Sequence, residues 1–212
     1  MIHTSKQLKD KVRNISKEDN EVAKALIRIF MMERFLERVS LSKYKNNFIL
    51  KGGMLVASIV GVDMRATMDI STDDVITPAA VEYEYKLMFE DRTISLLSYN
   101  TETLLAEKMQ TIIARGLANT RMRDFYDVCG IVRLNADKID YDLLVEAFQA
   151  TCKKRETVFS ISEIEDTLSK IKNDEPLAKM WERFRMKNFF VGDLQWEETL
   201  QEVLHIMGKL IE

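Results

Sequence analysis

The sequence predicts a helix-rich α+β protein, in which an αβ N-terminal segment (residues 1–99) precedes an all-α segment (residues 100–212). Only 7 of the 212 residues are Gly and 2 are Pro, which disfavours a loop-rich β sandwich and favours long helices. Hydrophobic residues make up 46% of the chain and charged residues 31%, a balance that excludes a disordered protein. Apolar residues recur at helical spacing through most of the second segment.

The expected elements of the first segment alternate between helices and short strands. Apolar residues at helical spacing indicate helices between residues 5 and 40, and Ser16 with Asp19 resembles a helix start. Two apolar runs around Glu90-Asp91-Arg92 predict a β-hairpin. In chain order, the further elements are a strand at Phe48–Leu50, a buried helix at Met54–Val60, a strand at Arg65–Ile70, and hairpin strands at Tyr83–Phe89 and Thr93–Tyr99.

The second segment is expected to be helical throughout. Polar residues that favour helix starts, such as Asp140 and Ser160, precede several of its apolar stripes, and Pro176 fits a first turn. The helices are expected from Asn100 or Thr101 to Arg115, from Arg121 to Leu134, from Asp140 to about Cys152, from Ser160 to Lys172, around Pro176, and from Asp193 to Ile211.

Composition limits where the protein works and what it binds. The 31 basic and 34 acidic side chains give a net charge of −3, which excludes a protein that coats nucleic acid but allows a local basic patch. No apolar run approaches the ~20 residues of a membrane span, and the first residues lack the apolar core of a signal peptide. Cys129 and Cys152 lie in helical patterns, so no disulfide framework is expected. We therefore expect a cytoplasmic protein without a membrane partner.

A glycine pair, Gly52 and Gly53, follows Lys51 between a predicted strand and a predicted helix. Glycines at such a turn let backbone N–H groups approach a phosphate, and the helix N-terminus adds positive potential. The alternative is a turn that only requires a left-handed backbone. The pair is too short for a P-loop or a dinucleotide-binding fingerprint.

Asp69 lies in the predicted strand at Arg65–Ile70. Carboxylates at positions i and i+2 of a strand face the same side, and such a pair can bind Mg²⁺ ions that bridge nucleotide phosphates. In this chain the i+2 residue is Ser71, so one of the two positions is acidic.

Charged residues border the apolar stripes of two predicted helices. Lys108 lies at such a border, where a cation can clamp a triphosphate; the alternative is a lysine whose stem covers apolar surface while its ammonium reaches water. Asp124 and Asp127 are three residues apart on the next helix and face the same way. Alternatively, Arg123 and Asp127 form an ordinary i,i+4 ion pair.

Taken in order, the segments FILKGGMLV, RATMDI, ETLLAEKMQTIIARG and TRMRDFYDV resemble the AbiEii/AbiGii-type nucleotidyltransferases, the toxins of abortive-infection toxin–antitoxin systems. The resemblance covers roughly residues 20–135. It implies a polymerase-β-like nucleotidyltransferase core followed by a helical region, a nucleoside triphosphate (NTP) as substrate and Mg²⁺ as cofactor. It also implies a role in phage defence and a cognate antitoxin as partner, with tRNA as the target in some members.

The same resemblance implies roles for individual residues. The implied catalytic residues are Asp69, Lys108 and Asp124; the implied nucleotide-binding residues are Lys51, Gly52, Gly53, Arg123 and Asp127; the implied metal ligand is Asp69. Because phosphate-handling residues act together only when they converge, we expect the two glycines and the three catalytic residues to line one cleft.

The chain departs from the family pattern after Asp69. Members carry a second acid two residues later and a stretch of sheet with a third acid, whereas this chain has Ser71 and passes almost directly to Asp74 and Pro78. The sequence therefore predicts a reduced core with an internal deletion. Two functions remain open: transfer of a nucleoside monophosphate to an RNA end or a protein hydroxyl, or a catalytically degenerate relative that binds an antitoxin or RNA.

Two further groups of residues invite alternative interpretations. Lys153, Lys154 and Arg155 follow a helix end, where they compensate the helix dipole or, with other arginines, form an RNA-phosphate track. The other arginines of that track are Arg115, Arg121 and Arg123. Aromatic residues are expected to pack helices together, with an exposed subset available to a partner; they are Trp181, Phe184, Phe189, Phe190 and Trp196.

Overall fold

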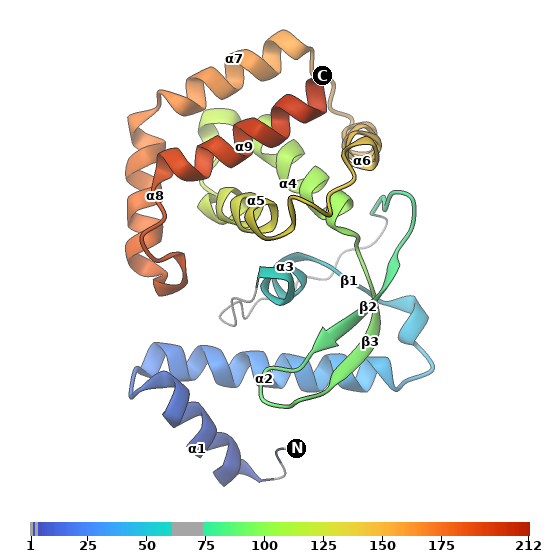
Figure 1. The fold of residues 1–212 in the computed structure, drawn as a ribbon, viewed down its shortest axis with the longest axis vertical. Helices are drawn as coiled ribbons and strands as arrows, with labels where there is room; N and C mark the ends of the chain where they lie inside the picture. The colour runs from blue at the N-terminus through green and yellow to red at the C-terminus, as the bar shows by residue number, and fades with distance from the viewer. Residues whose placement is uncertain (1, 3, 61–73) are drawn as a thin grey trace. The chain divides into compact units, whose positions relative to one another are not determined.

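The computed structural model describes residues 2, 4–60 and 74–212, and the chain divides into two compact units. Unit 1 comprises Met1–Ser71 and Ala80–Tyr99, and unit 2 comprises Thr72–Ala79 and Asn100–Glu212. Figure 1 shows the elements of each unit in chain order. The strand predicted at 65–70, with Asp69, lies outside the described residues, and so does Ser71.

Unit 1 begins with two helices, α1 (Ser5–Ser16) and α2 (Asn20–Ser40). The predicted start at Ser16 and Asp19 is in fact a break between them: α1 ends in two residues of positive φ, and the Asp19 side chain accepts hydrogen bonds from the first backbone N–H groups of α2. The helices pack through Val12, Leu26 and Phe30, which form a small core with a residue of the hairpin, Phe89.

The sheet of unit 1 has three strands among the described residues: β1 (Ile49–Leu50), β2 (Val81–Lys86) and β3 (Thr93–Ser98). Its order is β1-β3-β2, in which β3 pairs in parallel with β1 and antiparallel with β2, so the predicted hairpin is confirmed. The short 3₁₀ turn η1 (Lys45–Asn47) precedes β1, and α3 (Gly52–Val60) follows it. A second small core joins α2, α3 and the sheet; it contains Leu36, Val39, Met54, Tyr85, Leu87, Ile94 and Leu96.

Unit 2 is built from helices. Its elements are α4 (Thr101–Arg115), η2 (Gly116–Ala118), α5 (Met122–Asn135), α6 (Tyr141–Lys154), α7 (Ile161–Lys172), α8 (Glu175–Lys187), η3 (Phe189–Val191) and α9 (Trp196–Ile211). The predicted caps Asn100, Asp140 and Ser160 each accept a backbone N–H of their helix. The helix-rich α+β class predicted from the sequence is therefore confirmed.

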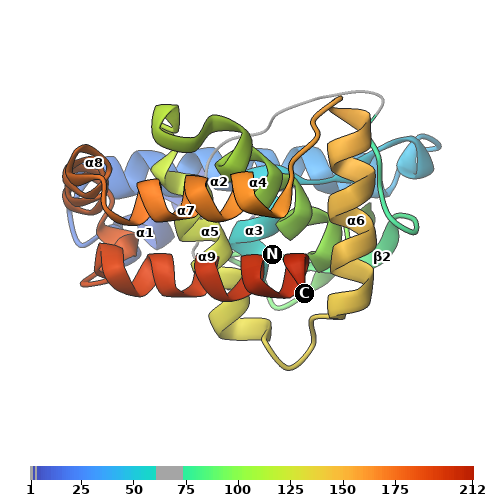
Figure 2. The same cartoon turned by 90° about the horizontal axis from the view of Figure 1, so that it is seen from above.

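Helix α4 lies at the centre of unit 2. Figures 1 and 2 show α7 and α9 running side by side over it, with α6 crossing near their ends. Leu104, Leu105, Met109 and Ile112 of α4 are almost completely buried, which fixes the position of the polar residues between them. No helix among the described residues is long and apolar enough to cross a membrane.

Candidate functional site

Helix α4 holds Lys108 in a defined position because its start is capped and most of its length is buried. Oδ1 of Asn100 accepts the backbone N–H of Thr103 at 2.7 Å. Nδ2 of Asn100 also donates to the carbonyl oxygen of Thr77 at 2.6 Å, which fastens the cap to the preceding segment. Leu105 and Met109, on the buried face, fix the rotation of the helix, so that Lys108 leaves it toward α5.

Helix α5 presents Asp124 and Asp127 on one face because they lie three residues apart. Its start is set by Asn119, which is fully buried and accepts the backbone N–H of Arg121 through Oδ1 at 2.9 Å. Phe125 is fully buried, which fixes the rotation of this helix as well.

Lys108 lies between these two aspartates. Its Nζ is 2.5 Å from Oδ2 of Asp127 and 3.3 Å from Oδ1 of Asp124. The side chains of Lys108, Asp124 and Asp127 are 11%, 15% and 2% exposed, so the three charges are held largely out of water. Charges are costly to bury, and such a group is retained either for a unique helix packing or for chemistry. We call these three residues the lysine–aspartate cluster.

The cluster decides between two interpretations of α5. An i,i+4 pair between Arg123 and Asp127 was the alternative, but Asp127 pairs with Lys108 from the neighbouring helix, and Arg123 makes no ion pair with any described residue. The cluster also retains hydrogen-bonding capacity: Oδ2 of Asp124 is buried and accepts no hydrogen bond from the part of the chain that the structure describes.

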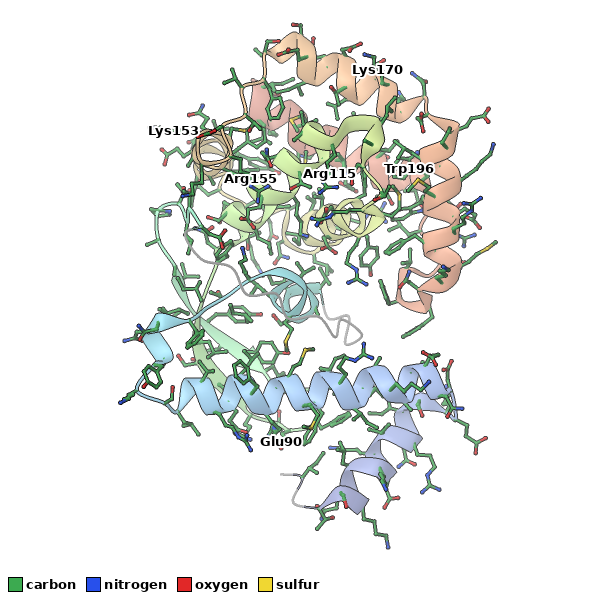
Figure 3. The ribbon with its side chains drawn as sticks, turned by 180° about the vertical axis from the view of Figure 1, so that it is seen from behind. Glu90, Arg115, Lys153, Arg155, Lys170 and Trp196 are labelled. Atoms are coloured by element: carbon green, nitrogen blue, oxygen red, sulfur yellow. The ribbon has the colours of Figure 1, made fainter. Side chains whose placement is uncertain are left out.

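Arg155 forms hydrogen bonds with three residues of α4. Its Nη1 donates to Oε1 of Gln110 at 2.5 Å and to Oγ1 of Thr111 at 3.0 Å, and its Nη2 lies 3.2 Å from Oε1 of Glu107. Figure 3 labels Arg155 beside α4, near Arg115 in the last turn of that helix. The guanidinium thus joins the end of α6 to α4, a role that the sequence did not reveal because Arg155 lies some 45 residues from its partners.

The glycine pair lies in unit 1, at the turn from β1 into α3. Gly52 has a φ of +66°, and a Cβ atom there would meet no atom within 4 Å, so the backbone conformation and not crowding favours glycine. Nζ of the preceding Lys51 lies 3.4 Å from the hydroxyl oxygen of Tyr99 and 5.4 Å from the centre of its ring. A positive side chain, a glycine turn and a helix N-terminus therefore follow one another at this point.

The predicted site residues fall into three places. The structure brings Lys108, Asp124 and Asp127 together in unit 2, while Lys51, Gly52 and Gly53 adjoin one another in unit 1. Asp69 lies outside the described residues. The single cleft expected to contain all of them stays a prediction.

The described residues do not form a metal centre. They contain no group of three or more His, Cys, Asp or Glu side chains that could hold a metal ion. Asp124 and Asp127 are already neutralised in part by the ammonium of Lys108. A divalent ion would need further hard oxygen ligands beyond these two acids, which do not make a metal site on their own.

The two cysteines are not candidate nucleophiles. Burial raises the pKa of the Cys129 thiol to about 11, and burial also raises the pKa of Cys152. Both thiols therefore remain protonated near neutral pH, whereas the reactive form of a cysteine is the thiolate. His205, on the last helix, packs edge-on against the ring of Tyr141 at the start of α6.

Comparison with known families gives one match. A family model described as "Nucleotidyl transferase AbiEii toxin, Type IV TA system" matches residues 64–204, about two thirds of the chain. The matched range contains the lysine–aspartate cluster and extends through most of the helical unit, while the glycine pair precedes it. No curated protein and no solved structure matches the chain.

Proposed function

The chain belongs to the AbiEii nucleotidyl transferase toxin family of type IV toxin–antitoxin systems, and we propose that it transfers a nucleoside monophosphate from an NTP to an acceptor hydroxyl. The acceptor is an RNA end, with tRNA as the first candidate, or a protein hydroxyl. In this reaction the acceptor hydroxyl gives up its proton to solvent, its oxygen bonds to the α-phosphorus, the bond from that phosphorus to the bridging oxygen of the β-phosphate breaks, and pyrophosphate leaves. The observation that carries the proposal is the lysine–aspartate cluster, which lies within the range matched by the family model.

Lys108 supplies the positive charge for the triphosphate. A lysine ammonium is a compact point charge with three donors, and two carboxylates on one side leave a third direction for a phosphate oxygen. Asp127, the more buried acid, anchors the ammonium, while Asp124 adjusts its direction. A charge held in place before the substrate arrives needs little reorganisation during the reaction.

Lys51, Gly52 and Gly53 form the second part of the proposed nucleotide site. The positive φ of Gly52 opens the turn before α3, whose N-terminus attracts anions, and Lys51 adds a cation beside it. We assign this turn to the triphosphate and Arg123 to a supporting contact, in keeping with its lack of an ion pair with any described residue.

The proposal includes Mg²⁺ through Asp69. When bound, the ion neutralises charge that develops on the phosphates. Asp124 and Asp127 serve Lys108 in this proposal and not the metal.

The proposal is tested by incubating the protein with each radiolabelled NTP, total tRNA and Mg²⁺, and separating the products on a denaturing gel. We expect labelled tRNA with the unaltered protein, none with EDTA, and none with Asp69→Ala or Asp124→Asn. The matched control is Asp166→Asn, because Asp166 is an exposed acid that pairs with Lys170, one turn along α7. Label that enters the protein itself instead of the tRNA assigns the reaction to a protein hydroxyl.

A second candidate function is a non-catalytic binding module for an antitoxin or RNA. It is favoured by Ser71, which stands where the family carries a second acid. Loss of a metal ligand removes several powers of ten in rate. No transfer with any NTP, together with NTP-independent binding of tRNA or of the cognate antitoxin, would establish it.

Membership of the family also bears on the partner of the protein and on where it acts. Type IV toxin–antitoxin membership implies an antitoxin partner. We place the protein in the bacterial cytoplasm and its action in phage defence. Growth arrest on expression, relieved by the neighbouring antitoxin gene, is the corresponding measurement.

A further inference from the structure

An aromatic group at the end of α8 is attached directly to the helix of the candidate site. Tyr126 lies between Asp124 and Asp127 in the sequence, and its hydroxyl donates to the carbonyl oxygen of Phe190 at 3.1 Å. Its ring meets that of Phe190 edge-on, with centroids 5.4 Å apart, and lies 6.4 Å from that of Phe184. The turn from α8 into η3 is therefore positioned by α5, the helix that also positions the two aspartates.

Phe189 projects from this aromatic group into solvent. Phe189 is 62% exposed, whereas Tyr126 is buried. Phe189 packs edge-on against Phe190, with ring centroids 6.0 Å apart and an interplanar angle of 79°, so one edge contact holds the ring while most of its surface stays open. A large aromatic residue held in this way offers a flat surface for stacking.

Two cations without ion pairs to any described residue lie in the last turns of α8, which ends two residues before Phe189. Arg183 and Lys187 are exposed, stand one turn apart on the same face of α8, and make no ion pair with any described residue. The neighbouring acids are engaged elsewhere: Glu182 and Asp193 both lie within 4 Å of the guanidinium of Arg185. The charge left available here is positive, although the chain as a whole carries a net charge of −3.

We propose that this surface, formed by Arg183, Lys187 and Phe189, binds single-stranded nucleic acid. A base stacks on Phe189, and the adjoining phosphates are neutralised by the two cations, which is the usual combination in single-strand binding. Uncompensated positive charge favours a phosphate backbone over an apolar protein surface, because an apolar partner would bury both cations without a counter-charge. The inference rests on the proposed function in one respect: the surface would hold the acceptor strand beside the helix that carries Asp124 and Asp127.

The test measures binding and not transfer. The full chain is titrated into a fluorescein-labelled oligoadenylate of about 12 nucleotides, with neither NTP nor divalent metal, and fluorescence anisotropy is recorded at several salt concentrations. We expect Phe189→Ala to weaken binding roughly 5- to 150-fold, the range found when one stacked base is lost. Phe189→Trp should retain binding, while Phe189→Leu should fail like Phe189→Ala, because leucine is apolar but not planar.

The cations are tested through the salt dependence. The double change Arg183→Ala/Lys187→Ala should lower the slope of log K against log salt by about 1.4, since each phosphate contact on a single strand contributes about 0.7. Lys179→Ala is the matched control: this lysine lies on the same face but pairs with Glu175, so its slope should stay that of the unaltered protein. Val158→Ala removes another exposed apolar side chain and should bind normally. Every variant should melt within a degree or two of the unaltered protein, because surface side chains add little stability.

Several outcomes overturn the assignment. These are no RNA binding by the unaltered protein, binding by Phe189→Leu equal to that of the unaltered protein, or an unchanged salt slope in the double variant. A self-association that Phe189→Ala abolishes assigns the surface to a second copy of the chain instead. If RNA binds through this surface but no nucleotide is transferred, the proposed function fails and this inference stands. If transfer occurs but Phe189→Ala binds RNA as tightly as the unaltered protein, this inference fails and the proposed function stands.

Discussion

Each unit of the molecule contains a cluster of charged side chains, and the two clusters differ in charge balance. In unit 1, two arginines face two glutamates: Arg34 lies 2.8 Å from Glu37 and 3.3 Å from Glu90, and Arg92 pairs with both acids. We call this the hairpin cluster, because it fastens the turn between β2 and β3 to α2. In unit 2, the lysine–aspartate cluster places two carboxylates against one ammonium.

The comparison separates charges used for structure from charges held for chemistry. The hairpin cluster is neutral and joins elements of unit 1, with no part in the segments that resemble the family. The lysine–aspartate cluster has one more acid than base, and its three residues stand in two of the segments that resemble the family. Proteins depart from the most stable arrangement mainly at functional sites. Substitutions in the hairpin cluster should therefore lower stability alone, whereas substitutions in the lysine–aspartate cluster should lower both stability and nucleotide binding.

The largest effect is expected for Lys108→Ala. Removing the ammonium leaves the carboxylates of Asp124 and Asp127 buried without it, which should lower the free energy of unfolding by about 3–5 kcal/mol in urea denaturation. The two ion pairs therefore give Lys108 a larger part in stability than a lysine whose ammonium reaches water would have. Lys170→Ala is the control: this lysine forms an exposed pair with Asp166, and its loss should cost at most about 1 kcal/mol.

A double change distinguishes lost pairing from lost packing. Asp127→Asn in the Lys108→Ala background removes the buried charge that the first change leaves behind. The combined loss should therefore fall short of the sum of the single losses by about 0.5–3 kcal/mol. Calorimetric titration with an NTP should show weaker binding for Lys108→Ala and for the double variant. Additive losses with unchanged NTP binding would make the cluster purely structural.

The next effect is expected for Glu90→Gln in the hairpin cluster. Burial acts to raise the pKa of Glu90, but the hydrogen bonds from Arg92 and from the backbone of Ile2, with the charge of Arg34, hold that pKa below its usual value. Losing the negative charge should lower the free energy of unfolding by about 1.5–3 kcal/mol at neutral pH. NTP binding should not change, in contrast to Lys108→Ala.

The pH dependence of stability follows from the same group. A carboxyl whose pKa is lower in the folded than in the unfolded protein stabilises the fold above the unfolded value, about 4.3 for Glu, and the stabilisation is lost as the pH falls through the folded value. Urea denaturation of the unaltered protein should therefore show a steeper loss below about pH 4.3 than that of Glu90→Gln. Parallel curves for the two proteins would show that folding does not lower the pKa of Glu90.

Local patterns predicted most of the fold. Helix starts at Asn100, Asp140 and Ser160 follow from side chains that cap their own backbone, and the hairpin follows from two apolar runs around a polar turn. The break after Ser16 was misplaced as a helix start, because the cap itself is Asp19 and the chain reverses through two left-handed residues that are not glycine.

The candidate site was only partly predictable. The spacing of Asp124 and Asp127 places them on one face, and the resemblance implied that Lys108 and Asp124 share a cleft. Local spacing does not decide whether Asp127 pairs with Lys108 or with Arg123, since that depends on how α4 and α5 pack. The same holds for Tyr126, whose partner Phe190 lies 64 residues away. Contacts of this length arise from tertiary packing, which no local pattern specifies.

The smallest effect is expected for Arg155→Lys, which tests whether the hydrogen bonds from Arg155 to α4 stabilise the fold. The guanidinium reaches Gln110, Thr111 and Glu107 of α4 at once, which the single ammonium of a lysine cannot do from the same position. Because Arg155 is partly exposed, the loss of free energy of unfolding should be about 0.5–1 kcal/mol, and Lys153→Ala, an exposed neighbour, should cost less.

The same variant bears on the alternative role of Arg155 as part of an RNA-phosphate track. A guanidinium that is committed to α4 has few donors left for a phosphate, and a lysine in its place would keep the charge. Arg155→Lys should therefore leave the salt dependence of oligoadenylate binding unchanged while lowering stability. Arg155→Ala extends the test, because it also removes the charge. A slope that falls by about 0.7 in Arg155→Ala, with no change in stability, would return Arg155 to the RNA-phosphate track.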